Sequence, residues 1–196
     1  ALIAMIMATV AFSIDAMLPA LPDIAAELTP DAPNRAQLII TSFVLGMGFG
    51  TFFTGPLSDR FGRKPVMIGG AVVYCGAALA AWAAPTLETM LAARLLMGLG
   101  AAGPRVVAIA LVRDIYSGRD MARIMSFVML VFSLVPAMAP SIGMIIISFA
   151  GWHAVFLAFV VFSGITVIWL GLRQPETLTP EGSVTCCLEI CLRFAL

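Results

Sequence analysis

Long apolar stretches dominate this sequence and restrict what it can fold into. Six of them reach about 20 residues or more, the length that a helix needs to cross the hydrocarbon core of a bilayer. Strands of a membrane barrel would instead alternate in polarity over about ten residues. The sequence therefore predicts an all-α membrane protein with six transmembrane helices. The six stretches are Leu2–Leu21, Ala36–Leu57, Val66–Ala84, Leu87–Val112, Ile124–Ala150 and Ala154–Leu172.

Composition supports a lipid environment and excludes one class of partner. Hydrophobic residues make up 61% of the 196 residues and charged residues 11%, whereas soluble domains contain about 25% charged residues. The formal net charge is zero, so a nucleic-acid partner, which needs a basic face, is not expected. A signal peptide is the rival interpretation of the first stretch, but that stretch contains Asp15 and two prolines. Since Ala1 lies inside it, we expect the native N-terminus to extend further.

Enzyme chemistry and metal binding have little support. The single histidine, His153, lies in a connector, and the sequence around Ser141 is only a near miss to a nucleophile-elbow motif. We expect no enzymatic activity, no metal and no cofactor. The four cysteines show no metal-ligand or redox spacing: Cys75, Cys186, Cys187 and Cys191.

Basic residues alternate between the connectors. The second and fourth connectors and the end of the sixth stretch contain seven, against only Arg35 in the other three connectors. The positive-inside rule then places both termini in the cytoplasm. We expect a bundle over residues 1–172 and a cytoplasmic tail over 173–196, whose end, Ser183–Leu196, is either loosely ordered or modified through its cysteines. The seven basic residues are Arg60, Arg63, Lys64, Arg113, Arg119, Arg123 and Arg173.

A weak internal repeat indicates how the helices are arranged. Ser42-Phe43-Val44 recurs 84 residues later as Ser126-Phe127-Val128. This offset carries the first three stretches onto the last three, and because three is odd, the second copy must be inverted in the membrane. Inverted 3+3 repeats are typical of transporters.

Two ionisable residues are predicted at similar depth in the membrane, where such groups are costly and usually functional. Asp15 lies seven residues before Pro22, and Arg94 lies seven residues after Leu87, which is roughly 10 Å in each case. We expect the two side chains to pair or to share a cavity. Asp15 is then either a group that exchanges a proton when its neighbours change or part of a structural ion pair.

Other residues in the stretches have two possible roles. Arg105 follows Arg94 by nearly three helical turns and is expected on the same face, lining a cavity or extending toward the cytoplasm. Prolines in the first and fifth stretches predict bends, and glycines in the second and fourth permit close helix contacts, for tight packing or for sliding. The prolines are Pro19, Pro22, Pro136 and Pro140, and the glycines are Gly46, Gly48, Gly50, Gly98, Gly100 and Gly103.

Several motifs resemble the major facilitator superfamily. Gly55–Pro65 resembles the loop between its second and third helices, and Arg94–Gly98 resembles its fourth-helix arginine motif. Ala139–Gly143 resembles the antiporter motif of its fifth helix. Asp15–Pro22 is similar to a pattern of the bicyclomycin/chloramphenicol-resistance (Bcr/CflA) drug:proton antiporters.

The resemblance implies the N-terminal half of a bacterial inner-membrane exporter. Its substrates would be amphipathic drugs, such as chloramphenicol-like or bicyclomycin-like compounds, and a proton gradient would drive it. Asp15 and Arg94 would handle protons or substrate. The helix-five motif would include Pro136, Pro140 and Gly143, and the cytoplasmic gate would include Gly55, Asp59, Arg60, Gly62, Arg63 and Lys64.

The sequence also departs from the family pattern. Met17, Met97 and Arg105 replace the usual tyrosine, glutamine and small residue, and all three are candidates for lining a cavity. Family members have twelve helices, so this chain would be a fragment or a half that pairs with a second copy. A non-transporting membrane module and a metabolite facilitator without proton coupling remain alternatives.

Overall fold

The computed structural model describes residues 2–30, 32–115 and 118–173, and these residues are helical almost throughout. The predicted tail lies outside the described residues, apart from Arg173 at the end of α7. The elements are α1 (Leu2–Asp15), η1 (Leu18–Ala20), α2 (Leu21–Leu28), η2 (Pro33–Gln37), α3 (Leu38–Phe61), α4 (Arg63–Trp82), α5 (Leu87–Ile115), α6 (Gly118–Ala150) and α7 (His153–Arg173).

The six predicted spans are present, with different limits. Five helical segments of the described chain are long and apolar enough to cross a membrane, and α7 is a further apolar helix. The predicted charged connectors are shorter than expected, because helices extend into them. Gly62 alone separates α3 from α4, and the basic residues Arg119 and Arg123 lie in the first turns of α6.

The first span is broken and extends beyond its predicted end at Leu21. It consists of α1, the short helix η1 and α2, and it ends at Leu28. Pro19 and Pro22 lie in the first turns of η1 and α2, where a residue without an N–H group is tolerated. By contrast, α6 continues through Pro136 and Pro140 as one helix. The prolines thus end a helix in one span and are accommodated within the other.

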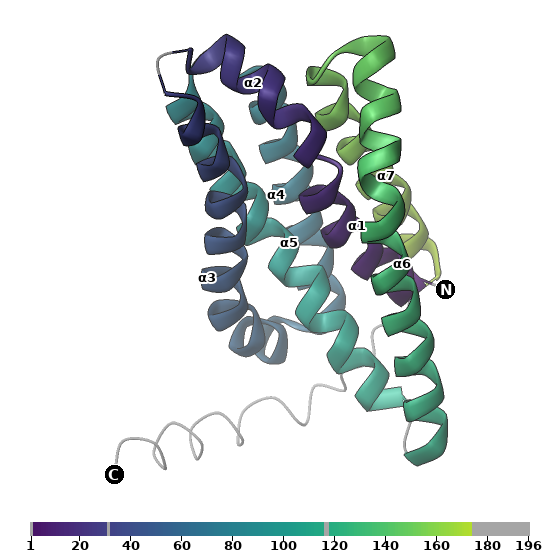
Figure 1. The fold of residues 1–196 in the computed structure, drawn as a ribbon. Coiled ribbons are helices and arrows are strands. Elements are labelled where there is room, and N and C mark those ends of the chain that lie inside the picture. Colours follow the sequence, from purple (N-terminus) through teal and green to yellow (C-terminus); the bar gives the residue numbers. More distant parts are fainter. Residues whose placement is uncertain (1, 31, 116–117, 174–196) are drawn as a thin grey trace.

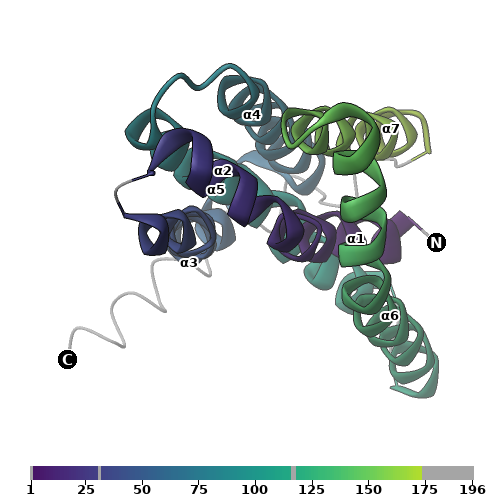
Figure 2. The ribbon, with the colours of Figure 1, turned by 45° about the horizontal axis from the view of Figure 1, so that its top comes forward.

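The helix packing has the symmetry of an inverted repeat. The first span packs through α1 against α6 and α7, while α5, the first helix of the second triplet, packs against α3 and α4. The third helix of each triplet, α4 and α7, packs against the other, and Figures 1 and 2 show these two side by side. Each contact therefore has a counterpart when the triplets are exchanged, which is the half-transporter arrangement that the 84-residue repeat predicts.

Glycines explain how closely α3 and α5 approach. A Cβ atom on Gly46 would collide with the backbone of Leu95, and one on Gly98 would collide with the backbone of Phe43. Small residues at such positions let helix backbones come together in membranes. Gly48 faces open space, so this predicted contact glycine does not contribute to the packing.

Two helices expose large apolar faces. In α3, Phe52 is 81% exposed, and in α6, Phe149 is 87% exposed. Figure 2 shows the length of α6 projecting away from the other helices. Lipid or further protein must cover these faces, because apolar surface of this extent is unfavourable in water.

Candidate functional site: a buried arginine beside a broken helix

The break in the first span places Asp15 at the end of α1. The chain turns at Ala16 and Met17, whose side chains are fully buried, before η1 begins. Asp15 itself is only half-buried, and its carboxylate forms no hydrogen bond or ion pair within the described part of the chain. A carboxylate at membrane depth without a fixed partner is unusual, since such groups normally pair.

Arg94 on α5 is the largest fully buried side chain, with 1% of its surface exposed. Its Nη1 donates a hydrogen bond to the backbone oxygen of Ser13, 3.3 Å away on α1. Its Nε and Nη2 atoms have no hydrogen-bond partner among the residues that the structure describes. The guanidinium group instead lies against three aromatic rings, with centroids at 4.9 Å (Phe156), 5.5 Å (Phe159) and 5.8 Å (Phe43).

These three rings form what we call the aromatic cage of Arg94. The cage joins α3 and α7 to α5, because Phe43 belongs to α3 and the other two rings to α7. Each ring face carries partial negative charge, and its attraction to a cation strengthens when water is excluded. The cage thus stabilises a positive charge where the structure provides no carboxylate in contact with it.

The expected ion pair between Asp15 and Arg94 is not formed. Within the described part of the chain, an ion pair forms elsewhere, between Asp59 and Arg63. The prediction of similar depth is nevertheless consistent with the geometry, since Arg94 binds the backbone of Ser13, two residues before Asp15. The guanidinium instead contacts the backbone of Ser13 in the last turn of α1 and the three aromatic rings, and not the Asp15 carboxylate.

Ser13 and Tyr74 add a hydrogen bond that the sequence did not reveal. The Ser13 hydroxyl donates to the backbone oxygen of Thr9 at 2.7 Å and is also hydrogen-bonded to the Tyr74 hydroxyl. Because Ser13 has one hydroxyl proton, Tyr74 acts as the donor to its oxygen. Both side chains are at most 2% exposed. A tyrosine in the middle of an apolar stretch was the available signal.

The remaining predicted cavity residues lie in the packed interior. Met17 and Met97 are fully buried, and the Met97 sulfur lies 3.9 Å from Nη1 of Arg94. Arg105 is half-buried, with its Nη1 3.3 Å from the sulfur of Met47 on α3. Contact of these side chains with a substrate would require the bundle to open, so their role stays a prediction.

A small cavity lies next to this interior but cannot hold a drug. Tyr74, Thr9, Ser163 and Thr166 contribute to its lining, and its volume is about 30 Å³. Pockets for drug-sized molecules measure roughly 300–1,000 Å³. A drug site therefore needs surfaces beyond the interior of this bundle.

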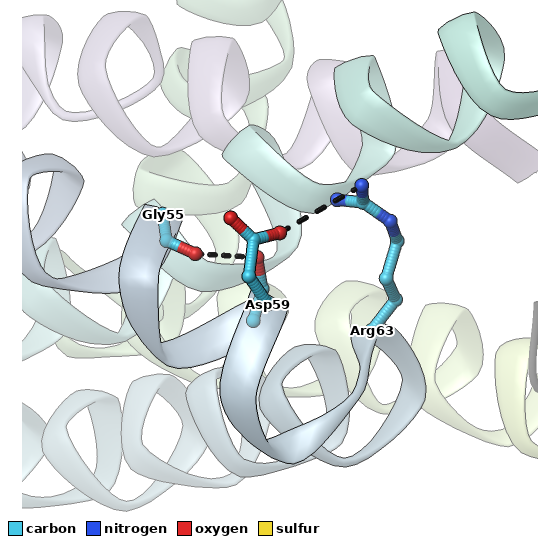
Figure 3. Close-up of polar contacts among 4 residues, drawn as sticks. Gly55, Asp59 and Arg63 are labelled. Atoms are coloured by element: carbon cyan, nitrogen blue, oxygen red, sulfur yellow. Dashed lines mark hydrogen bonds and ion pairs between the residues drawn. The ribbon is translucent and has the colours of Figure 1, made fainter. Parts of the chain in front are cut away.

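The predicted gate motif occupies the junction of α3 and α4. Asp59 Oδ1 and Arg63 Nη2 are 3.9 Å apart, and Ser58 Oγ donates to the backbone oxygen of Gly55 at 2.8 Å (Figure 3). Gly62 has φ +97°, a conformation that residues with side chains rarely adopt. The glycine thus permits the sharp reversal that brings Asp59 and Arg63 together.

The helix-five motif contacts the broken helix. A Cβ atom on Gly143 would collide with the backbone oxygen of Ala16, the residue after Asp15. Pro140 and Pro136 are half-buried in the same helix, about one and two turns earlier respectively. The two motifs predicted from separate stretches therefore meet at one contact between α6 and the end of α1.

A second polar contact ties the opposite end of the first span to the turn between α6 and α7. Trp152 Nε1 donates to Glu27 Oε2 at 2.7 Å, and the indole stacks on His153 with centroids 3.5 Å apart. Sequence reasoning assigned no role to Glu27 or Trp152. This contact closes the end of the bundle that lies away from the α3–α4 junction (Figure 1).

Known proteins match both the sequence and this arrangement. The sequence profile described as Major Facilitator Superfamily matches residues 2–185. A bicyclomycin resistance protein homolog of Haemophilus influenzae is 35% identical over 182 residues, covering 93% of this chain and 46% of that protein. The multidrug resistance protein MdtL of Escherichia coli is 37% identical over 175 residues, covering 87% of this chain and 44% of that protein.

Solved structures show the same fold at low identity. A D-xylose-proton symporter matches with a TM-score of 0.76 and 14% identity, covering 99% of this chain and 52% of the symporter. The human organic anion transporter MFSD10 matches with a TM-score of 0.73 and 18% identity, covering 93% of this chain and 48% of that one. The chain spans about half the length of the curated relatives it matches. On the evidence of the profile and the relatives, this chain belongs to the major facilitator superfamily.

Proposed function

We propose that this chain forms half of a proton-coupled exporter of amphipathic drugs in the inner membrane of a bacterium. Its relatives include proteins named for resistance to bicyclomycin, to chloramphenicol and to multiple drugs. The observation that carries the proposal is Asp15, a half-buried carboxylate in a membrane span with no partner among the described residues.

Asp15 is the proton carrier in this proposal. A carboxylate in a poorly solvated site favours its neutral form unless a cation or hydrogen-bond donors stabilise the charge. Because Asp15 lies where α1 is interrupted, small movements of η1 change its solvation. Asp15 would release its proton on one side of the membrane and take one up on the other.

Arg94 provides the fixed positive charge. The aromatic cage and the Ser13 carbonyl hold its guanidinium near the level of Asp15. An opening of the bundle that moves Asp15 toward this charge would favour loss of the proton. Arg94 then acts on Asp15 and on substrate charge from inside the core, and it need not leave the protein interior.

The gate residues act at the end of the bundle predicted to face the cytoplasm. Asp59 and Arg63 form an ion pair 3.9 Å long, in which the carboxylate of Asp59 is 52% exposed. Contact with water keeps such a pair weak enough to break in each cycle. Gly55, Arg60, Gly62 and Lys64 complete the loop that carries this pair. The contact of Gly143 with Ala16 would transmit movement of α6 to the end of α1.

A complete drug site requires a second half. The exposed apolar residues of α3 and α6 provide the surface that another six-helix unit would cover. That unit is either a second copy of this chain or a C-terminal half. With both termini in the cytoplasm, as the positive-inside rule predicts, a second copy would have to pair in parallel orientation.

The decisive experiment replaces one carboxylate and keeps a second as the control. Asp15→Asn and Asp23→Asn both change one carboxylate of the first span, but Asp23 is exposed in the first turn of α2. Inverted vesicles that contain the protein are energised with a proton gradient, and drug accumulation is measured. Loss with Asp15→Asn and retention with Asp23→Asn support coupling; unchanged transport in Asp15→Asn refutes it.

Two other outcomes identify the alternatives. Drug movement that is independent of pH in all variants indicates a facilitator without proton coupling. A monomeric mass in mild detergent, together with no drug-resistance phenotype, indicates a non-transporting module. The particle mass also distinguishes a dimer of halves from an unpaired chain.

A further inference from the structure

A groove on the outside of the bundle plays no part in the proposed transport path. It runs between α3 and α4, with α5 as its floor, and its volume is about 470 Å³. All three helices are candidate membrane spans, so the groove lies at membrane depth. Its lining includes Leu57, Phe61, Gly69, Val73, Gly100 and Gly103.

The groove opens away from the buried arginine. Gly103 lies nine residues after Arg94 on α5, which is two and a half turns and therefore the opposite face of the helix. Arg94 faces the aromatic cage, whereas Gly103 is part of the groove floor. A ligand in the groove would not meet Asp15 or Arg94.

The floor is deep because two helix backbones meet there. A Cβ atom on Gly70 would approach the backbone oxygen of Gly100 to 2.8 Å, and one on Gly103 would approach the backbone oxygen of Val66 to 3.2 Å. Gly70, Gly100 and Gly103 therefore add no side chain to the floor of the groove. Gly69 borders the groove and faces open space.

The walls are apolar and accessible. Phe61 is 60% exposed, Val73 48% and Leu57 46%. Along α4 the groove extends from Pro65 to Val73, a rise of about 12 Å. This elongated apolar channel matches the shape and chemistry of a hydrocarbon chain.

Positive charge gathers at one end of the groove. Phe61 and Pro65 form that end, and the segment from Asp59 to Lys64 carries three basic residues against one acidic residue. Arg63 pairs with Asp59, while the exposed Arg60 lies over the Phe61 ring at 5.6 Å. A cation is thus held at the mouth of an apolar groove.

We propose that this groove binds an anionic glycerophospholipid. One acyl chain lies along the glycine floor, and the headgroup phosphate contacts Arg60 at the α3–α4 junction. Basic pockets between transmembrane helices bind anionic headgroups in this way. The site does not depend on the proposed transport activity, and it would let the lipid composition of the membrane act on the gate loop.

The test uses two glycines on the same helix. Gly69 and Gly76 are both in α4, two turns apart, and both face open space, but only Gly69 borders the groove. Gly69→Leu fills the groove without disturbing helix contacts, and Gly76→Leu adds the same side chain outside it. The purified chain is stripped of lipid, incubated with phosphatidylglycerol or phosphatidylcholine, and bound lipid is counted by native mass spectrometry.

We expect wild type and Gly76→Leu to retain one phosphatidylglycerol in preference to phosphatidylcholine. Gly69→Leu should weaken binding about tenfold, because it displaces about two methylene groups from the groove. Arg60→Gln should weaken phosphatidylglycerol binding about fivefold and leave phosphatidylcholine unchanged. Circular dichroism establishes whether each variant is folded. If Gly69→Leu does not fold, the lipid binding of Arg60→Gln tests the proposal alone.

Three results would overturn the proposal. Equal retention of the two lipids by the wild-type chain would show that Arg60 does not contact the headgroup phosphate. Equal losses in Gly69→Leu and Gly76→Leu place the lipid elsewhere on α4. A change of oligomeric mass in Gly69→Leu, without loss of lipid, shows that a second copy of the chain covers the groove.

Discussion

Arg94 and Arg63 differ in how their charge is balanced, although Arg63 is also largely buried, with 13% of its side chain exposed. Arg94 is 1% exposed, without a carboxylate partner, and surrounded by aromatic rings. Arg63 lies at the α3–α4 junction and pairs with Asp59, whose side chain is 52% exposed. The ion pair is the more familiar interaction, yet water weakens it, whereas burial strengthens the cation–ring contacts. The comparison teaches that here the unpaired arginine, and not the paired one, organises the fold.

Arg94→Ala provides the severest test of this difference. We expect the free energy of unfolding to fall by about 3 kcal/mol, because truncating a large buried side chain leaves a cavity between the rings. Arg94→Met keeps most of the side-chain volume and also removes a buried charge that has no counter-ion. It should therefore lower the free energy of unfolding much less than Arg94→Ala. Thermal unfolding in detergent measures both. Equal stability of wild type and Arg94→Ala would contradict an organising role for the cage.

The hydrogen bond beside the cage should have an intermediate effect. Tyr74→Phe removes the donor to Ser13 and should destabilise the protein by about 1 kcal/mol. Ser13→Ala is the matched change on the other partner, and the double variant should be less destabilised than the sum of the two. Additive effects in this cycle would show that the two hydroxyls do not interact.

The Asp59–Arg63 ion pair, in which Asp59 is 52% exposed, should have the smallest effect on stability. Asp59→Asn is expected to change the free energy of unfolding by less than about 1 kcal/mol, and the difference should shrink as salt is added. The same unfolding measurement at low and high salt tests this, with Arg63→Gln as the partner change. A loss as large as that of Arg94→Ala would reverse the ranking of the two arginines.

The sequence predicted the spans more successfully than the contacts of the charged residues. Apolar length locates a membrane helix directly, so α3 to α7 fall near their predicted limits. Apolar length did not reveal that the first span continues after its break as far as Leu28. Prolines predict a bend, but whether a helix resumes afterwards depends on what packs beside it, here Trp152 on Glu27.

The sequence identified residues of the candidate site but not how their side chains are arranged. Asp15 and Arg94 were identified by the cost of charge in the membrane, and their levels agree with the contact of Arg94 and Ser13. The aromatic cage was missed because Phe43, Phe156 and Phe159 look like ordinary apolar residues in a sequence rich in phenylalanine. Nothing local to a phenylalanine indicates which cation its ring will face.

The sequence by itself determined that this chain lives in a bilayer, that it crosses it as two opposed triplets of helices, and which few residues carry charge into the apolar interior. These properties depend on side-chain transfer energies and spacing, which are read along the chain. Only the tertiary structure decided that Arg94 faces three rings and not Asp15, that Gly143 meets Ala16, and that Gly69 borders an open groove. Those outcomes depend on rotation and approach of neighbouring helices, which close packing between distant segments sets.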